Sequence, residues 1–314
     1  MPAPKTTPPR GRNREAGCVR CCQRRWLPEG GVEANFRGGR FGRRYPGTVK
    51  ILAWNLNHRA ARRRIPAWVY GAIAAESPDV VILTEYVEGE DHAHFVGELA
   101  ALGLVHADKT KRQGRQNELL VLARQPLKPG GIGVPAIHPS VPSNFLHVRL
   151  VQCGIDVIGF RMPAFAGKEL PRKRETWEWL IGELASLDHR TVVVGDFNTQ
   201  QGDASVLCGD CLERVAALGW TVAIPSDGFS WKSPGRGSGR KLDFALVSPG
   251  LRVESVSYSW AFTGLATEAA ELRTGLPDHA MLLLHVEAIP DSVATATGSR
   301  VAQPARSTPP PGGC

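Results

Sequence analysis

The chain has 314 residues, 42% of them hydrophobic, and a formal net charge of +8, so it is long enough for one large domain or two small ones with a buried core. No apolar stretch approaches the roughly 20 residues that cross a bilayer, and the N-terminus carries Arg and Pro in place of the apolar core of a signal peptide. These features argue against a helical membrane protein. They predict a cytoplasmic protein that makes no membrane contact.

The positive charge is concentrated at the N-terminus. Residues 1–48 hold 11 Lys/Arg against 3 Asp/Glu, and the rest of the chain has 27 charges of each sign. This segment is rich in Pro, Gly and Arg and lacks apolar periodicity, so we expect a disordered basic tail. Overall basicity therefore says little about what the folded part binds. Because a compact pattern starts only at Val49, we also hypothesise that the natural start lies downstream of Met1, which mapping of the native N-terminus would test.

Residues 49–289 alternate short β-branched runs with helical patterns, which predicts a single α/β domain. Eight strands are expected, at Val49–Trp54, Val80–Thr84, Leu119–Ala123, His147–Leu150, Asp156–Phe160, Thr191–Val194, Leu242–Val247 and Met281–Val286. Four helices have apolar residues near three- and four-residue spacing, at Arg63–Ala75, His92–Ala101, Arg172–Leu187 and Ser205–Leu218. A Gly-rich stretch at 226–240 predicts a mobile or ligand-binding loop. Residues 290–314 predict a second disordered tail.

Seven cysteines are present, an odd number in a chain whose size does not require disulfides, so we expect reduced thiols. Three of them, Cys18, Cys21 and Cys22, lie in the basic tail. Cys208 and Cys211 form a C-x-x-C pair with no second pair and no neighbouring His. A structural zinc site normally needs four ligands at compatible spacing. Incidental thiols are therefore favoured over a zinc site.

Several predicted strands lead into acidic or amide residues. The first strand runs into Asn55 and Asn57, the second into Glu85, and the strand at 191–194 leads through glycine to Asp196 and Asn198. Ligands of α/β sheets gather where strands end, because the loops there converge. Each of these residues alone is more often a helix cap, a turn or a solvated loop end. Their occurrence together indicates a functional site.

Oxygen atoms of this kind are natural ligands for a hard cation. Magnesium prefers one or two carboxylates, neutral oxygens and several waters, with a substrate phosphate completing its octahedron. Glu85, Asn57 and Asp278 match that preference. The sequence therefore predicts a Mg²⁺ site, with Mn²⁺ as an alternative metal.

Five short motifs carry a specific resemblance. In chain order they are Trp54-Asn55-Leu56-Asn57, Glu85 after an apolar strand, Gly195-Asp196-Phe197-Asn198, Lys241-Leu242-Asp243-Phe244 and Pro277-Asp278-His279. From about Val49 to Val286 the chain resembles the endonuclease/exonuclease/phosphatase superfamily, which includes exonuclease III, apurinic endonucleases, pancreatic deoxyribonuclease, sphingomyelinases and inositol polyphosphate phosphatases. The resemblance implies a four-layer α/β/β/α sandwich with two mixed β-sheets and a site at one rim.

The resemblance also implies roles for the matching residues. Glu85 would be the main metal ligand, joined by Asn57 and Asp278. Asp196 would orient or deprotonate the attacking water. Asn198 and Asn55 would fix the phosphate and the neighbouring carboxylates. His279 would be the charged donor to a phosphate oxygen, and Asp243 would orient its ring.

One position departs from the pattern. Many relatives carry His or Tyr after the strand at 156–160, where this chain has Arg161. An arginine at a strand end can grip a phosphate through two parallel hydrogen bonds. The alternative is a surface or structural arginine. This difference leaves the substrate class open.

Three function classes remain. The first is a nuclease acting as a monomer on nucleic acid, with basic residues near the site at Lys168, Arg172, Lys173, Arg174, Arg236, Arg240 and Lys241, although most basic runs are solvated faces. Trp231 or Trp260 would stack on a base, unless they belong to the core. The second is a phosphatase or phosphodiesterase acting on small or lipid phosphoesters, and the third is a binding protein that has lost catalysis. The intact acidic set favours an enzyme.

Overall fold

The computed structural model describes residues 47–290, except residues 58–64, 115, 135–136, 139, 166, 188–189, 206, 233–238 and 265–276. The two predicted tails, with Cys18, Cys21 and Cys22, lie outside the described residues apart from their inner ends, and so does Arg236. Within the described part, no helix is both long enough and apolar enough to cross a bilayer.

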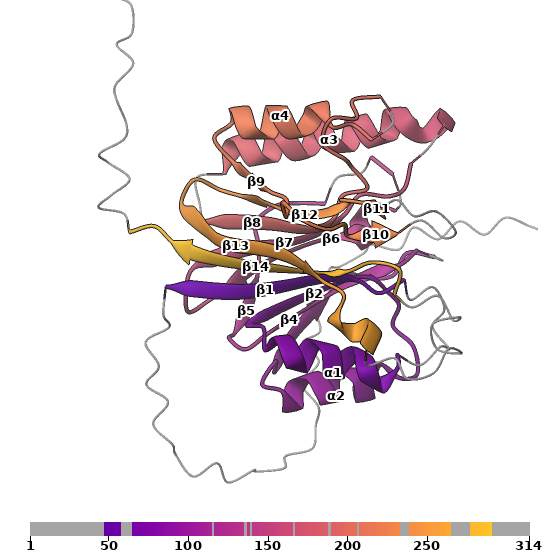
Figure 1. Cartoon of the computed structure of the whole chain (residues 1–314), viewed down its shortest axis with the longest axis vertical. Coiled ribbons are helices and arrows are strands. Elements are labelled where there is room, and N and C mark those ends of the chain that lie inside the picture. The colour runs from indigo at the N-terminus through magenta and orange to yellow at the C-terminus, as the bar shows by residue number, and fades with distance from the viewer. Residues whose placement is uncertain are drawn as a thin grey trace, which may run out of the picture. The chain divides into compact units, whose positions relative to one another are not determined.

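Two six-stranded sheets lie at the centre of the domain (Figure 1). The first sheet has the order β13-β14-β1-β2-β4-β3, formed by Leu251–Ser259, Met281–Ala288, Thr48–Asn55, Val80–Tyr86, Glu118–Ala123 and His106–Lys109. The second has the order β5-β6-β7-β8-β12-β9, formed by Leu127–Pro129, Phe145–Leu150, Ile155–Arg161, Thr191–Asp196, Asp243–Val247 and Thr221–Ala223. Both sheets are mixed, because β1 pairs with β2 and β7 with β8 in parallel. A short ribbon of β10 (Trp231–Lys232) and β11 (Gly239–Arg240) stands apart.

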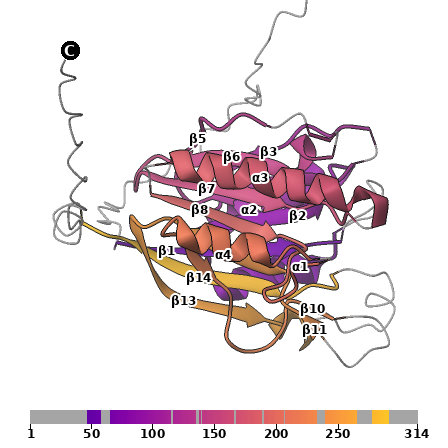
Figure 2. The ribbon, with the colours of Figure 1, turned by 90° about the horizontal axis from the view of Figure 1, so that it is seen from above.

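Three apolar layers hold these sheets and four helices together. The inner faces meet in a core that includes Ile51, Ile82, Val157 and Val192. The helices α1 (Ala67–Glu76) and α2 (His92–Ala101) cover the outer face of the first sheet, and α3 (Leu170–Ser186) and α4 (Asp210–Ala217) cover the second (Figures 1 and 2). Burial of apolar side chains in all three layers is the main stabilising contribution. The predicted four-layer α/β/β/α sandwich is confirmed.

All eight predicted strands and all four predicted helices are present, with shifted ends. The first helix begins at Ala67, because Pro66 stands at its N-cap with an extended ψ of 147°, a backbone state that cannot belong to a helix. The fourth begins at Asp210 and not at Ser205. Six strands were not predicted: the short strands β3, β5, β9, β10 and β11, and the long strand β13. In β13 a bulge between Val253 and Ser255 interrupts the alternation, so no period of two runs through the whole strand.

Candidate active site

The register of the second sheet brings three predicted site residues together at one end. Arg161 on β7 lies beside Asp196 on β8, which lies beside Asp243 on β12. From the first sheet, Asn55 at the end of β1 donates from Nδ2 to Asp196 Oδ2 at 3.0 Å. The two sheets therefore meet at Asp196, and the end of the sandwich that carries these residues is called the rim below.

A glycine is required directly before Asp196. Gly195 has φ of +146°, and a Cβ built there would lie 2.1 Å from the carbonyl oxygen of Phe160 on the neighbouring strand. Only glycine tolerates both the backbone angle and this close approach. Gly195 thus lets β8 pass close to β7 directly before Asp196, and this close approach sets the position of the Asp196 carboxylate at the rim.

Backbone strain is concentrated at the rim. Among the described residues, five non-glycine residues have positive φ, and three of them are predicted site residues: Asn57, Glu85 and Asn198. A left-handed backbone costs on the order of 1 kcal/mol or more for a non-glycine residue, and such residues cluster at functional sites. Glu85 also corrects one expectation, since it lies within β2 at a register irregularity between Leu83 and Tyr86 and does not follow the strand.

The Asp196 carboxylate is buried and held on both oxygens. Asn198 donates from its backbone N to Oδ1 at 3.0 Å and from Nδ2 to Oδ2 at 3.1 Å, in addition to the bond from Asn55. Burial and then the charge of Asp243 raise the pKa of Asp196 to about 6, although His279 and Arg161 oppose the rise. A carboxylate with this pKa is poised to accept a proton near neutral pH.

His279 and Asp243 form a buried pair next to Asp196. The Nδ1 atom of His279 lies 2.7 Å from Asp243 Oδ2. Burial lowers the pKa of His279, but the charge and hydrogen bond of Asp243, with further contributions from Asp196 and Asp278, outweigh it and raise the pKa to about 9. The imidazole is therefore cationic at neutral pH. Because Asp243 occupies Nδ1, Nε2 is the nitrogen left to address a substrate.

Arg161 faces acids at this site. Its Nη2 donates to Glu85 Oε1, and its Nε lies 3.7 Å from Asp196 Oδ2, with 14% of the side chain exposed. The guanidinium therefore lies between a carboxylate of the first sheet, Glu85, and a carboxylate of the second sheet, Asp196. It lies at the rim, where these contacts place a positive charge within the acid cluster.

The other two predicted metal ligands lie at the edge of this cluster. Asn57 is linked through its backbone N to Asn55 Oδ1 at 2.9 Å. Asp278 is half-buried, with Oδ1 4.0 Å from His279 Nε2, and Oδ2 accepts from Trp231 Nε1 at 3.3 Å. Within the described residues, the acidic and imidazole groups whose ligand atoms all lie within 4.8 Å of one another are Asp196, Asp243 and His279. Neither Glu85 nor Asp278, the two predicted carboxylate ligands, belongs to this group.

The sequence profile of the Endonuclease/Exonuclease/phosphatase family matches residues 52–275, which is more than two thirds of the chain. The chain belongs to this family. Its members are typically metal-dependent hydrolases of phosphoester bonds. No curated protein sequence matches the chain.

Solved structures share the fold of this family member. They include an endonuclease/exonuclease/phosphatase protein from Beutenbergia cavernae (18% identity, TM-score 0.58, covering 77% of this chain and 72% of that one). An AP endonuclease from Archaeoglobus fulgidus has 18% identity and a TM-score of 0.56, covering 75% and 98%. The 3' phosphatase NExo from Neisseria, bound to a product DNA hairpin, has 19% identity and a TM-score of 0.57, covering 75% and 98%. At these identities the likeness shows the fold.

The supporting roles of Trp54, Ser230 and Lys173 in this family member were not predicted from the sequence. The Nε1 atom of Trp54 donates to the His279 carbonyl at 2.9 Å, and the Ser230 carbonyl accepts from Ala280 N at 2.7 Å, so the backbone on both sides of His279 is fixed. Lys173 was expected on a basic surface, but it is buried, its pKa is lowered by burial, and its Nζ donates to the Asn198 carbonyl. Contacts of this kind leave no periodic signal in a sequence.

Ser230 gives a testable prediction. Its buried Oγ accepts from the backbone N of Leu242 at 2.8 Å and of Asp243 at 3.0 Å. Ser230→Ala should leave these two buried donors unsatisfied, at a cost of roughly 1–3 kcal/mol each. Urea denaturation should therefore show a lower free energy of unfolding. Ser257→Ala, on an exposed position of β13, is the control, and equal midpoints for the two variants would contradict this role.

Proposed function

We propose that this protein is a divalent-metal-dependent phosphodiesterase that hydrolyses nucleic acid with an activated water. The observation that carries the proposal is the juxtaposition at the rim of a buried carboxylate with a raised pKa, Asp196, and a buried imidazolium, His279, held by Asp243. A base for water and a fixed positive charge are the two groups that phosphoryl transfer asks of a protein.

The chemistry of the donors fits a hard cation. Glu85 and Asp278 offer carboxylate oxygens and Asn57 an amide oxygen, which is the set that Mg²⁺ or Mn²⁺ prefers. In the structure Glu85 is paired with Arg161, so a metal ion bound there would share this carboxylate with the guanidinium or displace it. In this proposal Glu85, Asn57 and Asp278 hold the metal. When bound, Mg²⁺ supplies positive charge at phosphate oxygens and lowers the pKa of a coordinated water.

The remaining steps belong to side chains of the chain itself. Asp196, whose oxygens are fixed by Asn55 and Asn198, orients the attacking water and accepts its proton. His279 donates from Nε2 to a non-bridging phosphate oxygen, where negative charge grows as the water attacks. Asp243 keeps the ring in the protonated, correctly oriented state. Neither group has to move far, because both are buried and hydrogen-bonded.

Nucleic acid is favoured as the substrate by two observations. Structures that share this fold include an AP endonuclease and a 3' phosphatase bound to DNA. An exposed arginine, Arg240, also lies on the ribbon next to the site. Small or lipid phosphoesters remain the second candidate class. A substrate panel with Mg²⁺ or Mn²⁺ separates them, using plasmid DNA, abasic-site duplex, RNA, sphingomyelin and inositol phosphates. Turnover of sphingomyelin or inositol phosphates alone would contradict the nuclease.

Arg161 gives a second prediction. If the Arg161 guanidinium also donates two hydrogen bonds to the phosphate, Arg161→Ala should lower kcat/KM by roughly ten- to a thousandfold. Arg161→Lys should recover only part of the loss. Because the side chain pairs with Glu85 and Asp196, we also expect lower stability, since one partner of a buried pair is removed. Steady-state kinetics and thermal melts measure both effects. Wild-type kinetics in a folded Arg161→Ala protein would make the residue structural.

A further inference from the structure

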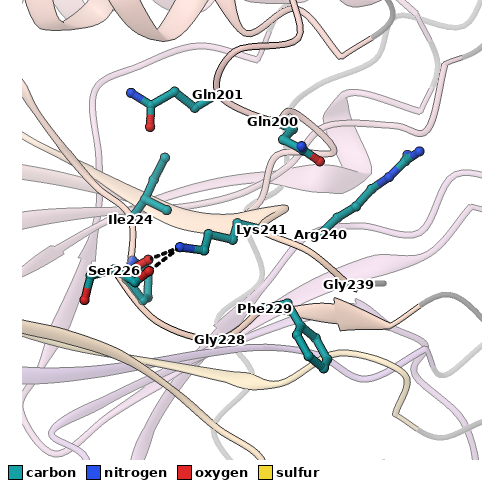
Figure 3. A pocket seen from close by; sticks show the side chains of 10 residues that line it. Gln200, Gln201, Ile224, Ser226, Gly228, Phe229, Gly239, Arg240 and Lys241 are labelled. Atoms are coloured by element: carbon teal, nitrogen blue, oxygen red, sulfur yellow. Dashed lines mark hydrogen bonds between the residues drawn. The ribbon is translucent and has the colours of Figure 1, made fainter. Parts of the chain in front are cut away.

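A cavity of about 440 Å³ opens beside the candidate active site (Figure 3). Its lining comes from the segment after β8, the segment after β9 and the segment that enters β12, and it includes Gln200, Gln201, Phe229, Arg240 and Lys241. Figure 3 shows the two glutamines along one side and Phe229 along the other. The volume is in the range of pockets that hold small organic ligands.

The cavity is joined to the catalytic groups through the backbone. Arg240 pairs with Trp231 in the β10–β11 ribbon, and Trp231 forms a bridge to His279. Neighbouring strands lie about 4.7–4.9 Å apart, so two such steps separate Arg240 from His279. On the other side, Gln200 follows Asp196 by four residues. A substrate whose phosphate sits between Asp196 and His279 would therefore extend its next unit toward this cavity.

The lining is cationic. It holds Arg240 and Lys241 and has no Asp or Glu. The Nζ atom of Lys241 donates to the carbonyls of Pro225 and Ser226 at 2.8 and 2.6 Å, which fixes the loop (Figure 3). Arg240 is exposed, its guanidinium carbon lies 6.0 Å from the centre of the Trp231 ring, and no carboxylate of the described residues pairs with it. Arg240 is thus available to an anion.

Three other basic residues near the rim are engaged. Lys173 is buried against the Asn198 carbonyl, Arg174 binds Asp210 and the carbonyl of Ala204, and Arg172 pairs with Glu169. Unlike these three, Arg240 has no acidic or carbonyl partner in the described part of the chain. Of the basic residues expected near the site and described by the structure, Arg240 and the exposed Lys168 lack such a partner, and of these two Arg240 lines the cavity.

The lining also offers neutral hydrogen-bonding groups. The Oε1 atom of Gln200 is buried and has no hydrogen-bond partner among the described residues. A buried acceptor without a partner costs free energy until a donor arrives. The amides of Gln200 and Gln201 carry both donors and acceptors, and the ring of Phe229 adds an aromatic wall. A planar ring that has hydrogen-bond donors and acceptors on its edge and is attached to an anionic chain fits this combination.

We infer that this cavity binds the nucleotide unit next to the scissile phosphodiester, with its phosphate at Arg240 and its base against Gln200 and Phe229. The inference rests on the proposed function and extends it, because it assigns a subsite that requires a substrate of more than one nucleotide.

The test is binding of a fluorescein-labelled 12-nucleotide single-stranded DNA by the full chain in chelator, followed by anisotropy. Arg240→Gln should raise Kd about tenfold and reduce the slope of log Kd against log salt by about 0.7, the value for one lost phosphate contact on a single strand. Arg240→Lys should restore part of the affinity. Lys128→Gln, an exposed residue of β5 at the opposite edge of the sheet, is the control and should leave Kd unchanged.

A second arm tests the base contact. An oligonucleotide of the same length made only of abasic units should bind the wild-type chain more weakly, and Gln200→Ala should reduce that difference. An unchanged Kd and salt slope in Arg240→Gln, in a preparation that hydrolyses DNA, would overturn the subsite and leave the proposed function standing. If the wild-type chain neither binds nor hydrolyses nucleic acid, the proposed function fails and the subsite fails with it.

Discussion

Asp196→Asn should lower kcat by roughly a hundredfold or more while the protein stays folded. The substitution keeps the size of the side chain but removes the base that we place next to the attacking water. The hydrogen bonds from Asn55 and Asn198 to Oδ2 become contacts to a neutral amide, so some local rearrangement is expected. Steady-state hydrolysis of the substrate identified by the panel measures the loss.

A matched control separates catalysis from a general effect of charge. Asp108→Asn removes a carboxylate of the same type on the edge strand β3, away from the rim, and should leave kcat unchanged. Thermal melts of both variants report folding. A folded Asp196→Asn protein with wild-type kcat would show that water is activated elsewhere.

His279→Ala should also lower kcat by roughly a hundredfold or more. Its pKa of about 9 keeps the ring cationic at neutral pH, and loss of a charged donor to the phosphate removes stabilisation that grows in the transition state. The same change leaves the Asp243 carboxylate buried beside Asp196 without its cation, so kcat should fall more than substrate affinity. Separate measurement of kcat and KM tests this.

The control for that variant is His285→Ala, a half-buried histidine on β14 six residues further along the chain. It should leave kcat within about twofold of the wild type, because surface and half-buried substitutions away from a site act on stability. An equal loss of kcat in the two variants would point to β14 packing and not to the imidazole of His279.

The sequence predicted the strands that are long and apolar. β1, β2 and β8 are buried along almost their whole length, so they appear as continuous apolar runs. β13 is different, because its outward residues are polar and the bulge after Val253 breaks the alternation. The two-residue strands β10 and β11 are too short for any period. Their position depends on contacts such as that of Trp231 with His279.

The candidate site could be predicted where residues stand at or near strand ends within family motifs. The nine proposed residues all lie at the rim of the two sheets or one contact away from it. Their partners could not be predicted, because the link from Trp54 to His279 joins residues 225 positions apart and the link from Ser230 to Asp243 depends on a loop. The buried state of Lys173 likewise follows from packing of α3 on the second sheet and not from its neighbours in the chain.

The central claim is that this rim hydrolyses nucleic-acid phosphodiesters with a divalent metal. The most direct measurement is the rate at which the full chain cleaves an end-labelled DNA or RNA oligonucleotide as Mg²⁺ is varied, with a parallel arm in excess chelator. We predict a rate that saturates with Mg²⁺, falls to background in chelator and returns when Mg²⁺ or Mn²⁺ is added back. Full activity in excess chelator, or no cleavage of any nucleic acid with either metal, would contradict the account.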